Sequence, residues 1–185
     1  MYDLHSILIQ LKKEDTPLHG VMVRCVRCFY QWLDPTLWEG SALFELWAQE
    51  LELIYGDLRQ RLSPNAKTDA GSLGDRFGFD TPPELPRLLQ SIQTFYSVLI
   101  KLIAWNTLRG ATPEPPLTEL LSGRAFVNRG IRNFCGDDWY IWPLDIWDPA
   151  LETQCEELRA CLMSLDTCPE CSTLSPDSNS RFFYS

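Results

Sequence analysis

The chain has 185 residues, of which 45% are hydrophobic, 12% aromatic and 22% charged, and its formal net charge is −9. This apolar content suffices for one hydrophobic core but not for two full domains, and it excludes a disordered or fibrous chain. Residues 134–185 hold ten acidic and two basic side chains, whereas residues 1–133 hold fifteen acidic and fourteen basic ones. Nucleic acid is therefore not attracted by the surface as a whole, and any such contact needs a local basic patch.

The first residues, MYDLH, lack the basic segment and apolar run of a secretory signal. The apolar stretch at residues 95–108 is shorter than a bilayer-spanning helix and contains Lys101. We therefore expect a cytoplasmic protein without a membrane partner.

Hydrophobic residues recur at helical spacing along almost the whole chain, which predicts an all-α fold. In chain order, the first expected helix covers residues 18–33 and ends before Pro35. A second helix is expected over residues 36–61, with Thr36 as its N-cap. Residues 62–83 are rich in Ser, Gly, Pro and Asp and predict a flexible surface loop.

The next helix, expected over about residues 84–109 and closed by Gly110, is hydrophobic nearly all round. Such a helix is surrounded by others, so we expect it at the centre of an irregular helical bundle. Its polar residues form one narrow strip, which consists of Gln90, Gln93, Thr94, Ser97 and Lys101.

A Pro-rich hinge is expected at residues 111–116, followed by a short helix that ends near Gly123. Residues 124–147 are aromatic and irregular, and a last helix is expected over residues 149–165. The Cys/Ser/Pro-rich residues 166–185 predict a disordered tail. The helical domain would therefore span residues 1–165.

Seven cysteines without an export signal argue against a disulfide framework. The two Cys-x-x-Cys pairs are Cys25/Cys28 and Cys168/Cys171. The first pair lies on the apolar stripe of a helix, which favours core packing over metal binding. The second lies in an open segment and is compatible with half of a zinc site, completed by Cys155 or Cys161.

No catalytic constellation stands out in the chain. The histidines, His5 and His19, do not neighbour a plausible nucleophile, and no glycine-rich phosphate loop is present. The adjacent acids Asp137 and Asp138 fit a helix N-cap better than a metal site or a general base. We therefore expect no catalytic residue and no cofactor in this chain.

Several stretches together resemble the helical N-terminal region of large bacterial N6-adenine DNA methyltransferases of restriction–modification and phage-defence systems. These stretches are residues 91–104 (SIQTFYSVLIKLIA), 130–134 (GIRNF), 137–142 (DDWYIW), 145–148 (DIWD), 41–47 (SALFELW) and 54–56 (IYG). The resemblance covers roughly residues 20–165 in the same order.

Members of that family continue into a methylase domain, with a glycine-rich cofactor loop and an Asp/Asn-Pro-Pro-aromatic motif that receives the flipped adenine. The nearest match here is residues 80–84 (DTPPE), which has one extra residue before the prolines and Glu84 in place of the aromatic ring. The resemblance therefore implies a non-catalytic module, encoded separately or truncated.

Three hypotheses follow, of which we favour the first. The first is a module that packs against a methylase domain or subunit and also contacts DNA, with Arg124, Arg129 and Arg132 as phosphate contacts. The second is a free-standing adaptor that binds another protein through an aromatic cluster. That cluster consists of Trp139, Tyr140, Trp142 and Trp147. The third is a small zinc module built on the second cysteine pair.

Overall fold

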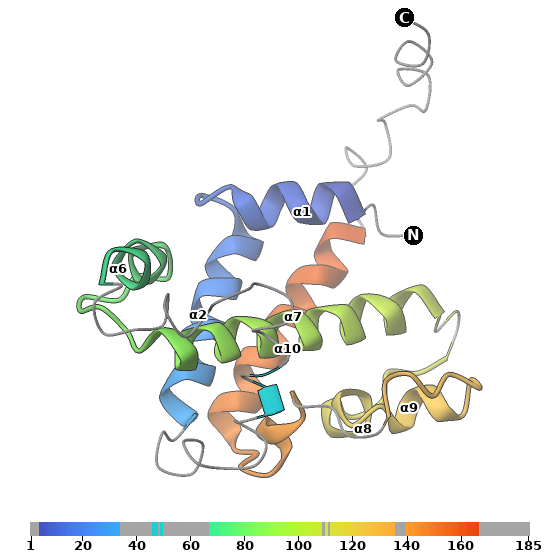
Figure 1. The fold of residues 1–185 in the computed structure, drawn as a ribbon. Helices are drawn as coiled ribbons and strands as arrows, with labels where there is room; N and C mark the ends of the chain where they lie inside the picture. The colour runs from blue at the N-terminus through green and yellow to red at the C-terminus, as the bar shows by residue number, and fades with distance from the viewer. Residues whose placement is uncertain are drawn as a thin grey trace, which may run out of the picture.

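The computed structural model describes residues 4–33, 46–47, 49, 67–108, 110, 112–135 and 140–166, and these residues are all-α (Figure 1). Seven α-helices and one 3-10 helix lie in these ranges. They are α1 (Leu4–Lys12), α2 (Pro17–Trp32), α6 (Lys67–Arg76), α7 (Leu85–Leu108), α8 (Leu117–Leu121), α9 (Arg124–Val127), the 3-10 helix η1 (Trp142–Leu144) and α10 (Pro149–Asp166).

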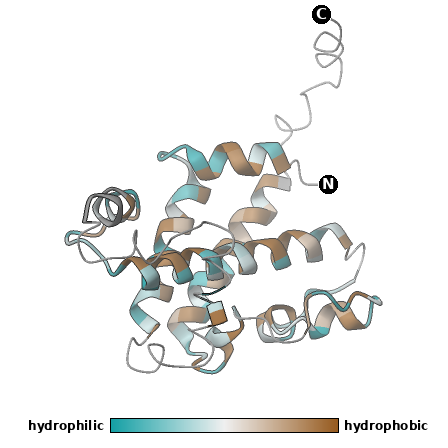
Figure 2. Ribbon diagram, in the orientation of Figure 1, coloured by the Kyte–Doolittle hydropathy of each residue, from teal (hydrophilic) through white to brown (hydrophobic). Residues whose placement is uncertain are grey.

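The core of the bundle forms where α2 crosses α7 and α10. Helix α1 packs on α2 at one end, and α8 and α9 lie against the second half of α7 (Figure 1). The largest fully buried apolar side chains come from α2, α7, α8, α9 and α10: Leu18, Val26, Phe29, Leu88, Phe95, Leu102, Leu120, Phe126, Leu151, Leu158 and Leu162. Figure 2 shows hydrophobic residues concentrated on the helix faces that meet in this core.

Helix α2 confirms the helix expected over residues 18–33. Thr16 caps it, because its side-chain oxygen accepts a hydrogen bond from the His19 backbone N–H at 3.2 Å, and Pro17 occupies the first turn. The helix ends at Trp32, where the Leu33 N–H still donates to Phe29 at 2.9 Å.

Helix α7 confirms the central helix expected over residues 84–109. Among the described helices it is the one long and apolar enough to cross a membrane by length and composition, and 56% of its most hydrophobic window is buried inside the bundle. Gly110 follows it with φ +55°, a conformation that favours glycine after a helix.

The expectation of a loop over residues 62–83 is wrong for residues 67–76, which form α6. Gly74 lies in this helix against the Pro83 ring, and a Cβ there would come 2.5 Å from Pro83 Cδ. Glycine lowers helix propensity, so the sequence of this segment does not predict a helix. Gly74 is needed here because it allows the close contact with Pro83. Helix α1, at residues 4–12, was also not predicted.

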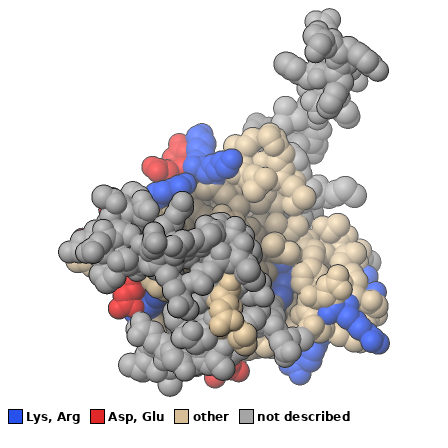
Figure 3. Space-filling model, in the orientation of Figure 1, with Lys and Arg blue, Asp and Glu red and all other residues tan. Residues whose placement is uncertain are grey.

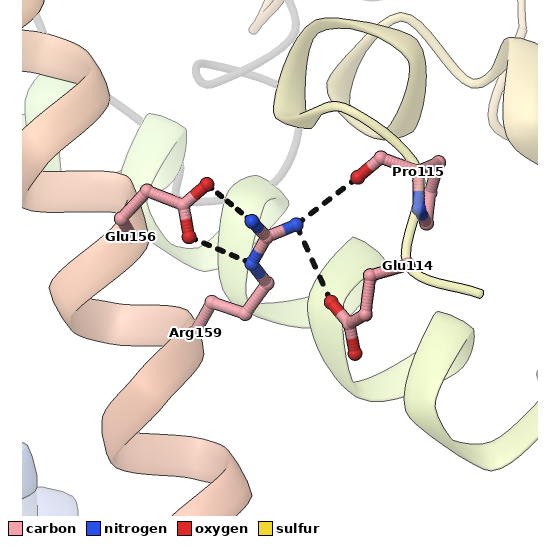
Figure 4. Close-up of polar contacts among 4 residues, drawn as sticks. All are labelled: Glu114, Pro115, Glu156 and Arg159. Atoms are coloured by element: carbon pink, nitrogen blue, oxygen red, sulfur yellow. Dashed lines mark hydrogen bonds and ion pairs between the residues drawn. The ribbon is translucent and has the colours of Figure 1, made fainter.

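Residues 112–116, the expected hinge, contain no helix and are fixed to α10 by Arg159 (Figure 4). The Arg159 guanidinium donates to the carbonyl of Pro115 at 3.1 Å, pairs with Glu114 at 3.3 Å and binds the carboxylate of Glu156 through two nitrogens. Most of the helix expected over residues 36–61 lies outside the described residues, although Leu46, Trp47 and Gln49 are helical. Of the tail expected to be disordered at residues 166–185, Asp166 is the last residue of α10, and residues 167–185 lie outside the described residues.

Candidate functional site

The polar strip of α7 holds the aromatic segment that precedes α10. The indole N–H of Trp142 donates to Thr94 Oγ1 at 2.9 Å, and the hydroxyl of Tyr140 donates to Gln93 Oε1 at 3.1 Å. The same amide oxygen accepts the indole N–H of Trp47 at 2.7 Å. Thr94 is fully buried, so these bonds satisfy polar groups that would otherwise destabilise the core.

Lys101, from the same strip, stabilises the end of α8. Its side chain is only 3% exposed, and its ammonium group donates to the carbonyl of Leu121 at 2.8 Å. The last carbonyls of a helix lack partners within the helix and carry partial negative charge, so a lysine there is favourable. Lys101 thus joins α7 to the α8–α9 region.

Two open concavities lie beside α7. One concavity, of about 240 Å³, lies where α1, α2, α6 and α7 meet, and another, of about 360 Å³, lies between α7 and the segment around Phe134 and Tyr140. Tyr96 lines both concavities. We call the two concavities together the α7 groove.

The α7 groove leaves large apolar side chains in solvent. Tyr96 is 42% exposed, Ile100 is 54% exposed and Leu8 of α1 is 53% exposed. Scattered exposed hydrophobics are common, but these three line two concavities that share Tyr96. Contiguous apolar surface of this kind is typical of a site that contacts another macromolecule.

The α1 end of the groove carries three basic side chains. Lys12, His19 and Arg76 line it around an apolar floor that includes Met22 and Phe77, and none of the described lining residues is Asp or Glu. We call this the basic end of the α7 groove. Sequence reasoning missed it, because α1 and α6, which supply Lys12 and Arg76, were not predicted.

The three arginines expected to contact phosphates all lie near α9, where Figure 3 shows basic side chains on the surface. Arg124 and Arg132 are exposed, and Arg124 donates to Ser122 Oγ at 3.2 Å. Arg129 donates to the carbonyl of Leu108 at 2.7 Å and to Thr112, and its guanidinium lies 5.5 Å from the ring of Trp105. All three arginines are exposed, and among them Arg129 also holds the end of α7.

The aromatic cluster expected to bind a partner points mainly inward. Trp142 packs edge-to-face on Phe29 at 6.0 Å between ring centroids, besides its bond to α7. Trp147 is half-buried against the core, and Tyr140 lines the α7 groove. Trp139 lies outside the described residues.

The first cysteine pair lies in the core, as the sequence indicated. Cys25 is fully buried and Cys28 half-buried where α2 meets α10. Burial raises the pKa of the Cys25 and Cys28 thiols, and burial with neighbouring thiol and carboxylate groups raises the pKa of Cys155 to about 12. Buried thiols of this kind pack as small apolar side chains. Cys168 and Cys171 lie outside the described residues.

Within the described ranges, no group of three or more His, Cys, Asp or Glu side chains is placed to hold a metal ion. Asp137 and Asp138 fall outside these ranges. Pro83, in the stretch compared with the methylase motif, is buried against α6 at Gly74 and therefore serves packing. No family model, curated protein or solved structure matches this chain.

Proposed function

We propose that this chain is a non-catalytic helical module that packs against and supports the methylase domain of a bacterial N6-adenine DNA methyltransferase, in a restriction–modification or phage-defence system. The single observation that carries a docking role is the α7 groove. It exposes apolar side chains on the central helix of the fold, where a partner would gain by burying them.

The choice of partner rests on the sequence resemblance. The resembling stretch at residues 91–104 lies against residues 140–142, which belong to another of these stretches. Trp142 bonds to Thr94, and Tyr140 bonds to Gln93. The resemblance therefore concerns one packed unit, α7 with the aromatic segment beside it, and the same unit forms a wall of the groove.

Co-expression with an N6-adenine methylase domain encoded in the same genome tests the proposal. We expect the two proteins to co-purify and the pair to transfer methyl groups from S-adenosylmethionine to DNA. Ile100→Asp should weaken the association at least about tenfold, because burying an unpaired carboxylate in an apolar contact is costly. Val127→Asp is the matched control, since Val127 is 44% exposed on α9 and does not line the groove.

A wild-type chain that is folded and monodisperse, yet binds no methylase domain from its genome, would contradict the proposal and favour the adaptor hypothesis. Trp142 contacts Phe29 and Thr94 inside the fold, so Trp142→Ala would also destabilise the protein. Loss of partner binding in that variant alone would therefore not identify the aromatic cluster as the binding surface. Binding to Trp147→Ala, at a residue of the aromatic cluster that does not line the groove, compared with Ile100→Asp would then separate the two surfaces.

DNA contact is the second part of the proposal and has its own test. Arg124→Gln with Arg132→Gln should lower the slope of log K against log salt concentration for DNA binding by the complex by about two, one for each phosphate contact. An unchanged slope removes both arginines from the DNA surface without affecting the docking role.

A further inference from the structure

We propose that the α7 groove binds an amphipathic helix of the partner that carries acidic side chains at one end, and that this acidic end lies on Lys12, His19 and Arg76. The inference rests on the proposed function in that the helix belongs to the methylase domain. The inference adds the chemical character of the bound helix and states which end of it lies next to α1.

The charges at the basic end are unused within the described part of the chain. Lys12 and Arg76 are exposed and make no ion pair there. Other basic side chains of the same bundle do have acidic partners, as Lys13 does with Asp15 at 3.8 Å and Arg24 with Glu157 at 2.9 Å. In a chain of net charge −9, a depression whose described lining residues include three basic side chains and no acidic one is complementary to an anionic group.

The rest of the groove favours an apolar occupant of helical shape. Its floor follows α7 from Ile92 at the basic end to Ile100 at the other, which is about 12 Å at the rise of an α-helix. Tyr96 and Ile100 are four residues apart and form a ridge on which a second helix can pack. Two turns of an amphipathic helix match this length, and helix-in-groove binding uses such anchors.

The two ends of the groove differ in charge, which fixes the direction of the occupant. At the far end the one lysine, Lys101, is buried and its ammonium group donates to Leu121, so that end is lined mainly by apolar and neutral side chains. An acidic end is therefore attracted to the α1 end of the groove alone. Electrostatic complementarity of this kind gives orientation and specificity more than affinity.

The test uses synthetic helical peptides of 14 residues with identical leucine positions and two Glu, two Gln or two Lys residues at one end. Each pair is placed at either the N-terminal or the C-terminal end, so that the intrinsic effect of charge on the peptide helix is controlled. Fluorescence polarisation at low salt measures binding to the full chain. Of the two Glu peptides, we expect the one that binds more tightly to exceed the Lys peptide with the same charge position at least about fivefold in affinity. Added salt should reduce this difference.

The double variant Lys12→Glu/Arg76→Glu should reverse this preference. The matched control is Lys13→Glu/Arg124→Glu, which changes the net charge equally at sites that do not line the groove, and it should keep the preference for Glu. Ile100→Asp should weaken all peptides alike.

Equal affinity for Glu and Lys peptides, or a preference for Glu that survives Lys12→Glu/Arg76→Glu, would overturn the inference. So would a dimer of this chain that the same double variant dissociates, because the groove would then hold a second copy. The co-expression experiment separates this inference from the proposed function. If Ile100→Asp abolishes association with the methylase domain but Lys12→Glu/Arg76→Glu leaves it unchanged, the proposed function stands and only the acidic end of the occupant is rejected.

Discussion

Replacing Gly123 by alanine should be among the most damaging single-methyl changes in this protein. Gly123 lies between α8 and α9 with φ +80°, and a Cβ there would come 1.9 Å from the carbonyl oxygen of Phe134. Real Cβ atoms essentially never approach closer than 3.0 Å, and the obstacle is backbone, which cannot rotate away. The segment around Phe134 must therefore move by about 1 Å or more.

The cost follows from three contributions. An alanine in the left-handed region costs about 1–2 kcal/mol, and forcing a methyl group into occupied space typically costs about 1–3 kcal/mol. Moving Phe134 also loosens its ring contact with Phe126, now at 4.5 Å between centroids, which is worth about 0.5–1.5 kcal/mol. We expect Gly123→Ala to lose about 3–5 kcal/mol of unfolding free energy.

Gly130→Ala is the matched control. Gly130 also has positive φ, +75°, but nothing lies within 4 Å of its added Cβ, so only the backbone cost of about 1–2 kcal/mol applies. Urea unfolding followed by far-UV circular dichroism measures both variants. If the two lose the same free energy to within about 0.5 kcal/mol, the close approach of Phe134 to the α8–α9 turn is refuted.

Three further predictions concern other contacts of the fold. A double-mutant cycle of Trp142→Phe and Thr94→Val should give a coupling of about 1 kcal/mol, the value of one buried hydrogen bond; a coupling near zero would show that the bond does not hold the aromatic segment on α7. The thiol of Cys155 has its pKa raised to about 12 from 9.0, so its contribution to stability is complete below pH 9 and is lost as the pH rises toward 12. Between pH 9 and pH 10 the wild type should therefore lose about 1 kcal/mol more than Cys155→Ala in urea unfolding, and parallel losses would contradict this. Arg159→Lys should lose about 1–2 kcal/mol of unfolding free energy in urea, because an ammonium group cannot reproduce the fork of donors to Glu156 and Pro115; an unchanged unfolding free energy would mean that this segment is held by other contacts.

Much of the fold could be read from hydrophobic spacing. The expected helices at residues 18–33, 84–109 and 149–165 correspond to α2, α7 and α10, because each carries an apolar stripe with helical period, and boundary signals such as Pro35 and Gly110 mark where two of them end. The apolar position of Cys25 was also evident from its place on such a stripe. These properties depend on residues within a few turns of one another.

The candidate site could not be read in the same way. Spacing shows which residues of a helix are apolar, but not which of them a neighbouring helix covers, so the exposure of Ile100 and Tyr96 required the placement of every other element. The partners of the polar strip, such as Trp142 for Thr94, lie almost fifty residues away. Helix α6 contains Gly74, which lowers the helix propensity of the segment but permits the close contact with Pro83. Sequence alone thus determined the helical class and the central helix, because these follow from local periodicity. Tertiary structure alone decided the groove and its charged end, because they arise where separate helices meet.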